Sequence, residues 1–347
     1  MNRTIMICLA VLLVLGLSAC AQADSKAAAE QSAVPSAVDS TEQNVLPEST
    51  EPPAPEMIDF EVNRYAVTVG AAAYLGGAEE QYKALVDAVC SKKETEPYTD
   101  EDAAKRAAEV FAETPYSAFA DVTAQNGAFQ ITYNETGDAD TFDTAVKELI
   151  EGCVYKDANE LEKALLLYRT VASEFAQEGG ENGSLYKTIT EQKGSAEDLA
   201  NVLTYLFLQN GISADRVSGM VGESERSWTA AKLSGNRYHF DAAAEKHATD
   251  GHGLQYFGMS DEARSKAGSP APYTVGEGNY AVQQDTLSTD TKFDAVFADV
   301  KDFTVDVYGH FVYLSTELPS LPKTATKIPS APKALRLRWG ECFLKIK

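Results

Sequence analysis

The stretch KGSAEDLANVLTYLFLQNGI, residues 193–212, decides the fold of this chain. It begins with a Gly-Ser turn, continues as an apolar run of helical composition, and stops at Asn210-Gly211. The start of a helix suits a reactive anionic side chain, because backbone N–H groups point outward there and the dipole favours negative charge. The turn nevertheless holds only Gly194, Ser195, Ala196 and Glu197. A position that suits a strong nucleophile, such as a cysteine thiolate, therefore lacks one.

Length and composition allow one large domain or two modest ones. The chain has 347 residues, of which 44% are hydrophobic, so it can bury a substantial core. Its formal net charge is −22, which would repel the phosphates of nucleic acid. We therefore exclude nucleic acid as a partner and expect a soluble, exported folded part.

Residues 1–20 are predicted to be a lipoprotein signal peptide. Arg3 supplies a positive start, and the apolar run at 5–17 is too short to be a comfortable permanent membrane span. The run ends in LSAC, residues 17–20, which resembles the bacterial lipobox. That resemblance implies that Cys20 becomes the lipid-bearing first residue, anchored to the outer face of a bacterial membrane. An ordinary signal peptide with a chance Cys is the alternative.

Residues 21–58 are predicted to be a disordered tether between the membrane and the folded part. The segment lacks aromatic residues, is rich in Ala, Ser, Glu, Gln and Pro, and has acidic residues in excess of its single Lys26. Such a composition cannot bury enough apolar surface to offset the entropy of ordering.

Residues 59–153 are predicted to form a small α+β unit of unassigned role. Helical spacing appears in 79–89, 99–113 and 141–154, and two strand-like runs flank Asn126-Gly127, a strong hairpin signal. The segment contains no His and shows no catalytic cluster.

Residues 154–316 carry the pattern that suggests a family. A long amphipathic helix at 157–177 precedes the 193–212 helix, and strand-like runs follow at 213–221, 226–235 and 237–245, before a last segment at 256–268. This order resembles the transglutaminase-like superfamily in its bacterial extracellular form. The matching residues are Gly194, Glu197 and Ala200; Gly211-Ile212; Val217-Ser218-Gly219; Trp228, Lys232-Leu233 and Gly235; Tyr238-His239-Phe240-Asp241; and Tyr256-Phe257 with Ser260-Asp261-Glu262.

The resemblance implies an α+β fold with a papain/transglutaminase-like core, in which a helix packs on an antiparallel sheet. It also implies a Cys-His-Asp triad, in which the Cys attacks an acyl carbon and the His moves the proton. Read without gaps, the Cys position is Ala196, the His position is Arg226, and only Asp241 is kept. Alanine has no nucleophile and arginine cannot act as a base, so we expect a catalytically inactive pseudoenzyme.

An active enzyme is the alternative reading of the same residues. Ser195 lies one position from the vacant site, and His239 and Asp241 lie two apart on a strand, so they share a face. A displaced triad for acyl transfer or amide hydrolysis can be drawn from these three, although His239 can equally be an ordinary hydrogen-bonded histidine of the sheet. A purely structural lipoprotein is a third possibility.

For the inactive domain we expect a cleft that binds peptide or cell-wall material, with Glu197, Trp228 and Tyr238 as candidate lining residues. We also expect Arg226 to form a salt bridge with Asp241 across the former active site, unless Arg226 turns toward Glu223 or Glu225. No cofactor and no metal are expected. The loop HATDGH at 247–252 has the wrong spacing for a helix-face metal pair.

The remaining features leave questions open. Cys90, Cys153 and Cys342 are three thiols, so at least one is unpaired within the chain, and no disulfide is assigned. Residues 317–347 form a basic tail with four prolines, for which contact with anionic wall polymers and disorder are both considered.

Overall fold

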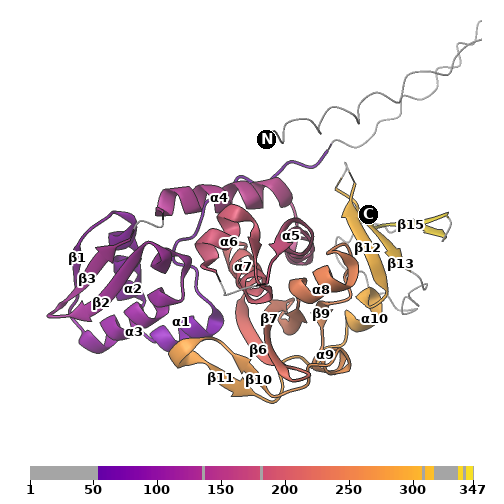
Figure 1. The fold of residues 1–347 in the computed structure, drawn as a ribbon. Helices are drawn as coiled ribbons and strands as arrows, with labels where there is room; N and C mark the ends of the chain where they lie inside the picture. The colour runs from indigo at the N-terminus through magenta and orange to yellow at the C-terminus, as the bar shows by residue number, and fades with distance from the viewer. Residues whose placement is uncertain are drawn as a thin grey trace, which may run out of the picture. The chain divides into compact units, whose positions relative to one another are not determined.

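We analysed a computed structural model, which describes residues 54–134, 137–179, 183–306, 309–315, 335–338 and 341–346. The signal peptide, Cys20 and almost all of the predicted tether lie outside the described residues. Residues 52–347 belong to one compact unit. This unit combines helices with antiparallel sheets, so the predicted α+β class is confirmed (Figure 1).

The first part of the unit contains a three-stranded antiparallel sheet beside short helices (Figure 1). Its strands lie in the order β1-β3-β2, and the predicted hairpin at Asn126-Gly127 joins β2 to β3. Both turn residues have positive φ, at 55° and 77°, which explains the Asn-Gly pair. The elements are α1 (Val69–Leu75), α2 (Glu79–Cys90), β1 (Thr95–Pro97), α3 (Glu101–Ala112), η1 (Pro115–Ala118), β2 (Ala120–Gln125), β3 (Ala128–Tyr133) and α4 (Ala139–Cys153).

The second part contains a six-stranded antiparallel sheet in the order β11-β10-β6-β7-β8-β9. Its long central strands are β6 and β7, joined by a tight hairpin. The elements are α5 (Glu160–Glu174), β4 (Ala176–Gln177), α6 (Leu185–Glu191), β5 (Lys193–Gly194), α7 (Ala196–Gln209), β6 (Ala214–Val221), β7 (Ser224–Leu233), β8 (Asn236–Phe240), α8 (Ala242–Thr249), β9 (Phe257–Met259), α9 (Asp261–Lys266), β10 (Tyr273–Val275), η2 (Gly278–Tyr280) and β11 (Val282–Gln284).

The third strand-like run, predicted at 237–245, is shorter than expected. Strand β8 ends at Phe240, and Asp241 caps the helix α8 by accepting the N–H of Ala244 at 2.8 Å. The run of alanines that follows favours helix over strand once that cap is present. Asp241 therefore lies at a strand-to-helix junction rather than inside a strand.

The last elements add a four-stranded antiparallel sheet in the order β12-β13-β15-β14. Two of its strands fall in the predicted basic tail, which is therefore strand-forming at residues 335–338 and 341–346; its other residues lie outside the described ones. The elements are α10 (Asp294–Phe297), β12 (Val300–Val305), β13 (Phe311–Ser315), β14 (Leu335–Arg338) and β15 (Glu341–Ile346).

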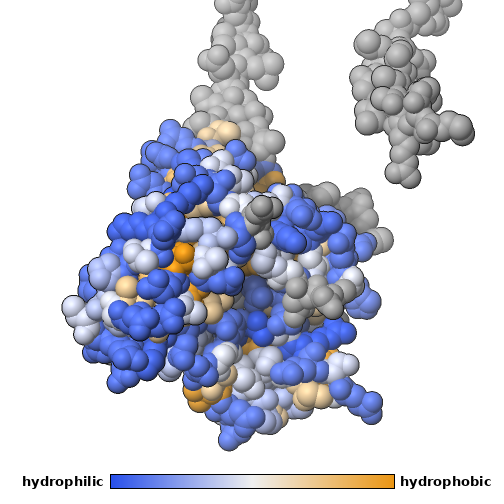
Figure 2. Space-filling view, turned by 60° about the vertical axis from the view of Figure 1, so that its left-hand side comes forward, coloured by the Kyte–Doolittle hydropathy of each residue, from blue (hydrophilic) through white to orange (hydrophobic). Residues whose placement is uncertain are grey.

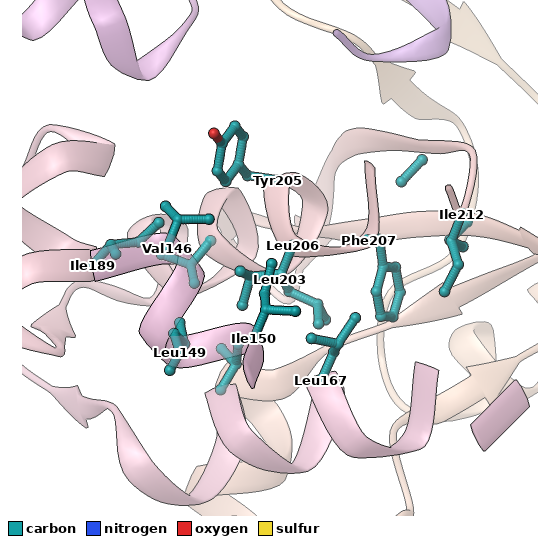
Figure 3. Close-up of a cluster of buried hydrophobic side chains, with 14 of the residues drawn as sticks. Val146, Leu149, Ile150, Leu167, Ile189, Leu203, Tyr205, Leu206, Phe207 and Ile212 are labelled. Atoms are coloured by element: carbon teal, nitrogen blue, oxygen red, sulfur yellow. The ribbon is translucent and has the colours of Figure 1, made fainter. Parts of the chain in front are cut away.

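Helix α7 lies at the centre of the hydrophobic core. Figure 3 shows Leu203, Leu206 and Phe207 of α7 on the side that meets Ile150 of α4 and Leu167 of α5. The opposite side meets the sheet, where the Thr229 hydroxyl of β7 donates to the Ala200 carbonyl at 3.0 Å. The main cluster of buried side chains extends from Phe60 to Tyr313, so it joins the two predicted segments. A smaller, separate cluster contains Val217, Trp228, Ala230, Tyr273 and Val275.

We predict that Leu206→Ala lowers the free energy of unfolding by about 2–5 kcal/mol, because Leu206 is fully buried and its removal leaves a cavity between α7 and its neighbours. Val282→Ala is the control, since Val282 is 56% exposed. Urea denaturation followed by circular dichroism measures both. Equal small effects for the two variants would contradict the central place of α7.

Candidate functional site

The N-terminus of α7 is closed by the chain's own carboxylates. Ser195 caps the helix by accepting the N–H of Asp198 at 3.1 Å, and Asp198 in return accepts the N–H of Ser195 at 2.8 Å. The buried Asp198 carboxylate also accepts the N–H of Gly183 at 3.0 Å. A Cβ on Gly194 would lie 2.6 Å from the Asp198 Cβ, which explains the glycine. The outward N–H groups that could stabilise an anion are thus partly used by Asp198.

The candidate nucleophile position, Ala196, is the first residue of α7 and presents only a methyl group. Next to it, the Glu197 carboxylate accepts from Arg216 of β6 at 2.8 Å. Glu197 and Asp198 place two acidic groups in the first turn, where they offset the positive end of the helix dipole. A thiolate at this turn would face both carboxylates, the reverse of the environment that activates a cysteine.

The predicted salt bridge between Arg226 and Asp241 is wrong. The Asp241 carboxylate instead accepts from Nη1 of Arg264 in α9 at 2.8 Å, and both side chains are buried. Arg226 is exposed on β7, opposite Gly219. The reason is register: β8 pairs with β7 only as far as Thr229 opposite Phe240, and beyond that point the chain turns into α8.

Arg264 completes a buried cluster beneath the sheet. Its guanidinium carbon lies 4.0 Å from the centre of the Trp228 ring, and its side chain is 2% exposed. A cation on an indole face is attractive, and the effect grows when both groups are shielded from water. Trp228 therefore covers the ion pair that Arg264 forms with Asp241.

His239 is fully buried, and both of its ring nitrogens are engaged. The Trp228 indole N–H donates to Nδ1 at 2.8 Å, and indole is only a donor, so Nδ1 must be the acceptor. The proton then lies on Nε2, which donates to Asp261 Oδ1 at 2.8 Å. Burial lowers the pKa of His239, which favours this neutral form. No ring lone pair remains to accept a proton from a nucleophile.

The alternative triad of Ser195, His239 and Asp241 is therefore not assembled. His239 is oriented by Asp261, Asp241 is bound by Arg264, and the Ser195 hydroxyl oxygen accepts a backbone N–H at the helix start. Asp261 is held in turn by the backbone N–H groups of Leu287 and Ser288, each at 2.9 Å. The arrangement is that of a hydrogen-bonded structural histidine.

Two of the three predicted cleft residues are in the wrong place. Trp228 and Tyr238 are 0% and 1% exposed, so neither lines an open cleft. The Tyr238 hydroxyl donates to Asp290 at 2.5 Å, and its ring packs beside Phe293. Only Glu197, whose side chain is 30% exposed, reaches the surface. Successive side chains of a strand point to opposite faces of the sheet, and either face can be buried. The sequence pattern alone therefore does not tell whether Trp228 and Tyr238 are buried or exposed.

A cavity of about 410 Å³ lies on another side of α7, and sequence analysis did not find it. Asn201, Thr204, Tyr205 and Leu208 of α7 form one wall, and the other walls come from α1, α3, η1, the start of α6, β6 and η2. Its charged lining residues are Glu113, Arg216 and Glu277. These three are far apart in the sequence, so no motif could have joined them.

The Glu277 carboxyl is the most perturbed acid in this cavity. Burial raises its pKa to about 7; Arg216 opposes the rise, and the neighbouring Glu113 carboxyl adds to it. The Arg216 guanidinium binds two carboxylates. Its Nη1 donates to Glu277 at 2.7 Å, and its Nη2 donates to Glu197 at 2.8 Å. Burial and the neighbouring carboxyl therefore both favour the protonated form of Glu277.

Within the described residues, no group of three or more His, Cys, Asp or Glu side chains could hold a metal ion. In that same part of the chain no helix is long and apolar enough to cross a membrane. Cys90 and Cys153 are free thiols, and burial raises the pKa of each to about 11. Cys342 lies in β15, and its pairing stays open.

Comparison with known proteins adds little. No family model and no curated protein matches this chain. A solved structure from Cytophaga hutchinsonii, described as a "Putative Cysteine Protease", matches at 19% identity with a TM-score of 0.26. The match covers 51% of this chain and 57% of that one, so this chain aligns with little more than half of that protein. At this level it carries no functional conclusion.

We predict that Arg264→Ala and Asp241→Ala each lower the free energy of unfolding by roughly 3–5 kcal/mol, because each leaves a buried charge without its partner. The double variant should cost less than the sum, since it removes both charges. Arg226→Ala, at an exposed position, is the control and should change stability little. Coupling between Arg226 and Asp241 in a double-mutant cycle, with none between Arg264 and Asp241, would contradict the observed pairing.

Proposed function

We propose that this chain is a membrane-anchored surface lipoprotein whose folded unit is a catalytically inactive, transglutaminase-like binding module. The anchor is Cys20, and the location is the outer face of a bacterial membrane. The module binds peptide or cell-wall material without transforming it. The motif order at 194–262 supports the relationship, and the packing of α7 on an antiparallel sheet agrees with it.

One observation carries the proposal of inactivity: no nucleophile stands at the proposed position, and the polar groups of His239 and Asp241 already serve the fold. Ala196 offers no nucleophile, the ring nitrogens of His239 are bound by Trp228 and Asp261, and the Asp241 carboxylate holds Arg264. Nucleophilic catalysis needs a nucleophile and an adjacent base with a free lone pair. Neither is present at these positions.

The binding role is supported by the cavity beside α7 and by the character of the surface. A cavity of about 410 Å³ falls in the range of small-ligand pockets and combines an apolar wall with a few convergent charged groups. Figure 2 shows a largely hydrophilic face with only scattered hydrophobic residues. The strongly acidic composition agrees with that face and with a life outside the cell.

We predict that the purified protein releases no ammonia from glutamine peptides, incorporates no amine into them and cleaves no peptide bond above a protein-free blank. The double substitution Ala196→Cys and Arg226→His should stay inactive, because Arg226 lies away from Asp241 and two carboxylates crowd the helix start. Mass spectrometry of the peptides measures all three reactions.

Turnover by the unaltered protein that disappears in Ser195→Ala would overturn this proposal and favour the enzyme reading.

We predict that Cys20→Ser releases the protein from the membrane fraction into the medium, because the lipid-bearing residue is lost. Cys8→Ser is the matched control. Cys8 lies inside the apolar run of the signal, so this variant should stay membrane-bound. Membrane fractionation and labelling with an alkyne fatty acid measure the outcome. Lipid label on the Cys20→Ser variant would show that the anchor lies elsewhere.

A further inference from the structure

The buried network around His239 ties two segments of the chain to the sheet. His239 lies in β8, and Asp261, which accepts from its Nε2, lies at the start of α9. The Asp261 carboxylate also accepts the backbone N–H groups of Leu287 and Ser288, which lie between β11 and α10. The backbone N–H of Asp261 donates in turn to the Ser288 carbonyl at 2.8 Å. One aspartate therefore holds α9 and residues 287–288 against β8.

The Trp228 ring is packed too closely to direct its N–H group elsewhere. A Cβ on Gly219 would lie 2.8 Å from Cη2 of the indole, so the backbone of β6 touches the ring. The Arg264 guanidinium lies 4.0 Å from the ring centre, and Tyr273 meets the ring edge-on at 5.9 Å. Trp228 is fully buried, so a turn of the ring would have to displace these neighbours. The indole N–H is thereby kept on Nδ1 of His239.

Protonation of His239 removes the acceptor that Trp228 uses. In the neutral ring, Nδ1 accepts the indole N–H at 2.8 Å. In the imidazolium form both ring nitrogens carry protons, so two donors would face each other at this distance with no acceptor between them. A buried donor without an acceptor costs the desolvation free energy of that group. The contact between Nε2 and Asp261 survives protonation, so the strain falls on the contact between His239 and Trp228.

The environment of His239 favours the neutral ring. Burial is the largest influence and lowers the pKa of His239 from its ordinary value of 6.5. Asp261 and Asp241 oppose this fall, whereas the Arg264 guanidinium adds to it. Asp241 is itself bound to Arg264 at 2.8 Å. The Tyr273 ring lies 4.9 Å from the His239 ring and is neutral, since burial raises its pKa to about 12.

We propose that His239 is an acid-sensitive switch, whose protonation breaks the hydrogen bond to Trp228 and releases α9 and residues 287–288 from the sheet. In the opened state the ring is in water and takes up a proton more readily than in the closed state. The closed state therefore keeps its full stability above pH 6.5 and loses it as the pH falls toward the lowered pKa of the closed state. In a chain exported as proposed, the switch responds to the pH of the medium.

The switch lies apart from the cavity beside α7 and does not rest on the proposed binding function. Trp228 belongs to the smaller buried cluster with Tyr273, whereas the next residue, Thr229, points to the other face of the sheet and contacts α7. Burial raises the pKa of Glu277 in the cavity to about 7, so its protonation stabilises the fold as the pH falls. The effects of Glu277 and His239 have opposite signs, and a variant of His239 separates them.

The test is amide hydrogen exchange of the purified full chain at pH 7.5 and pH 5.0, measured by mass spectrometry and corrected for the intrinsic exchange rate at each pH. The ratio of closed to opened molecules should fall about tenfold per pH unit below pH 6.5, until the pKa of the closed state is reached. We therefore expect protection in peptides that cover 285–290 to fall at least threefold. Helix α4, which carries none of the network residues, is the internal control and should change less.

Variants tie this loss of protection to the switch. His239→Asn keeps an acceptor near the place of Nδ1 but takes up no proton, so it should abolish most of the fall. His252→Gln removes an exposed histidine, is the matched control and should keep the fall of the unaltered chain. Trp228→Phe removes the opposing donor and should make the fall smaller. Circular dichroism at pH 7.5 checks folding, and Trp228→Phe carries the test if His239→Asn does not fold.

Three results would each overturn the switch. They are a fall in protection at 285–290 of less than threefold, an equal fall in α4, and a fall in the folded His239→Asn or Trp228→Phe variant as large as that in His252→Gln. None of these results bears on the absence of turnover or on binding at the cavity, so the proposed function is tested separately.

Discussion

The burial of α7 on two sides is the constraint on which the rest of the structure depends. Leu203, Leu206 and Phe207 lie on the side of α4 and α5, and the other side of the helix meets β6 and β7. A helix of such apolar composition is stable only when it is buried between two layers. This packing fixes the position of the helix, and the capping box of Ser195 and Asp198 satisfies the backbone N–H groups at its first turn. The side chains in the first turn then determine the chemistry at the helix start. Here they are the methyl group of Ala196 and the carboxylates of Glu197 and Asp198.

The polar groups around Trp228 form one buried network that links three elements. Trp228, His239 and Asp261 form one chain of hydrogen bonds, while Arg264 joins Trp228 to Asp241. Each of these side chains contacts a side chain of another element, so the network ties β7, β8 and α9 together. Removing one member strands another, which makes the cluster strongly coupled. Catalysis would require a free lone pair here, and the fold leaves none.

The cavity beside α7 has the opposite character. Its two acids, Glu113 and Glu277, outnumber its single arginine, Arg216, and burial raises the pKa of Glu277 to about 7. Strongly perturbed pKa values and unbalanced charges occur more often in binding sites than in clusters that only support the fold. This contrast is the reason why we propose binding at the cavity and not at the network around Trp228.

The sequence by itself determined the α+β class, the position of α7 and the hairpin at Asn126-Gly127, because these depend on local periodicity, caps and turn residues. The prediction that Ala196 stands at a nucleophile position also came from the sequence, through the family that the motifs resemble. Only the tertiary structure decided that Asp241 pairs with Arg264 rather than Arg226, that Trp228 and Tyr238 are buried, and that Glu113 meets Glu277. Strand register, the turn after Phe240 and the convergence of distant segments set these contacts, and a linear pattern does not contain them.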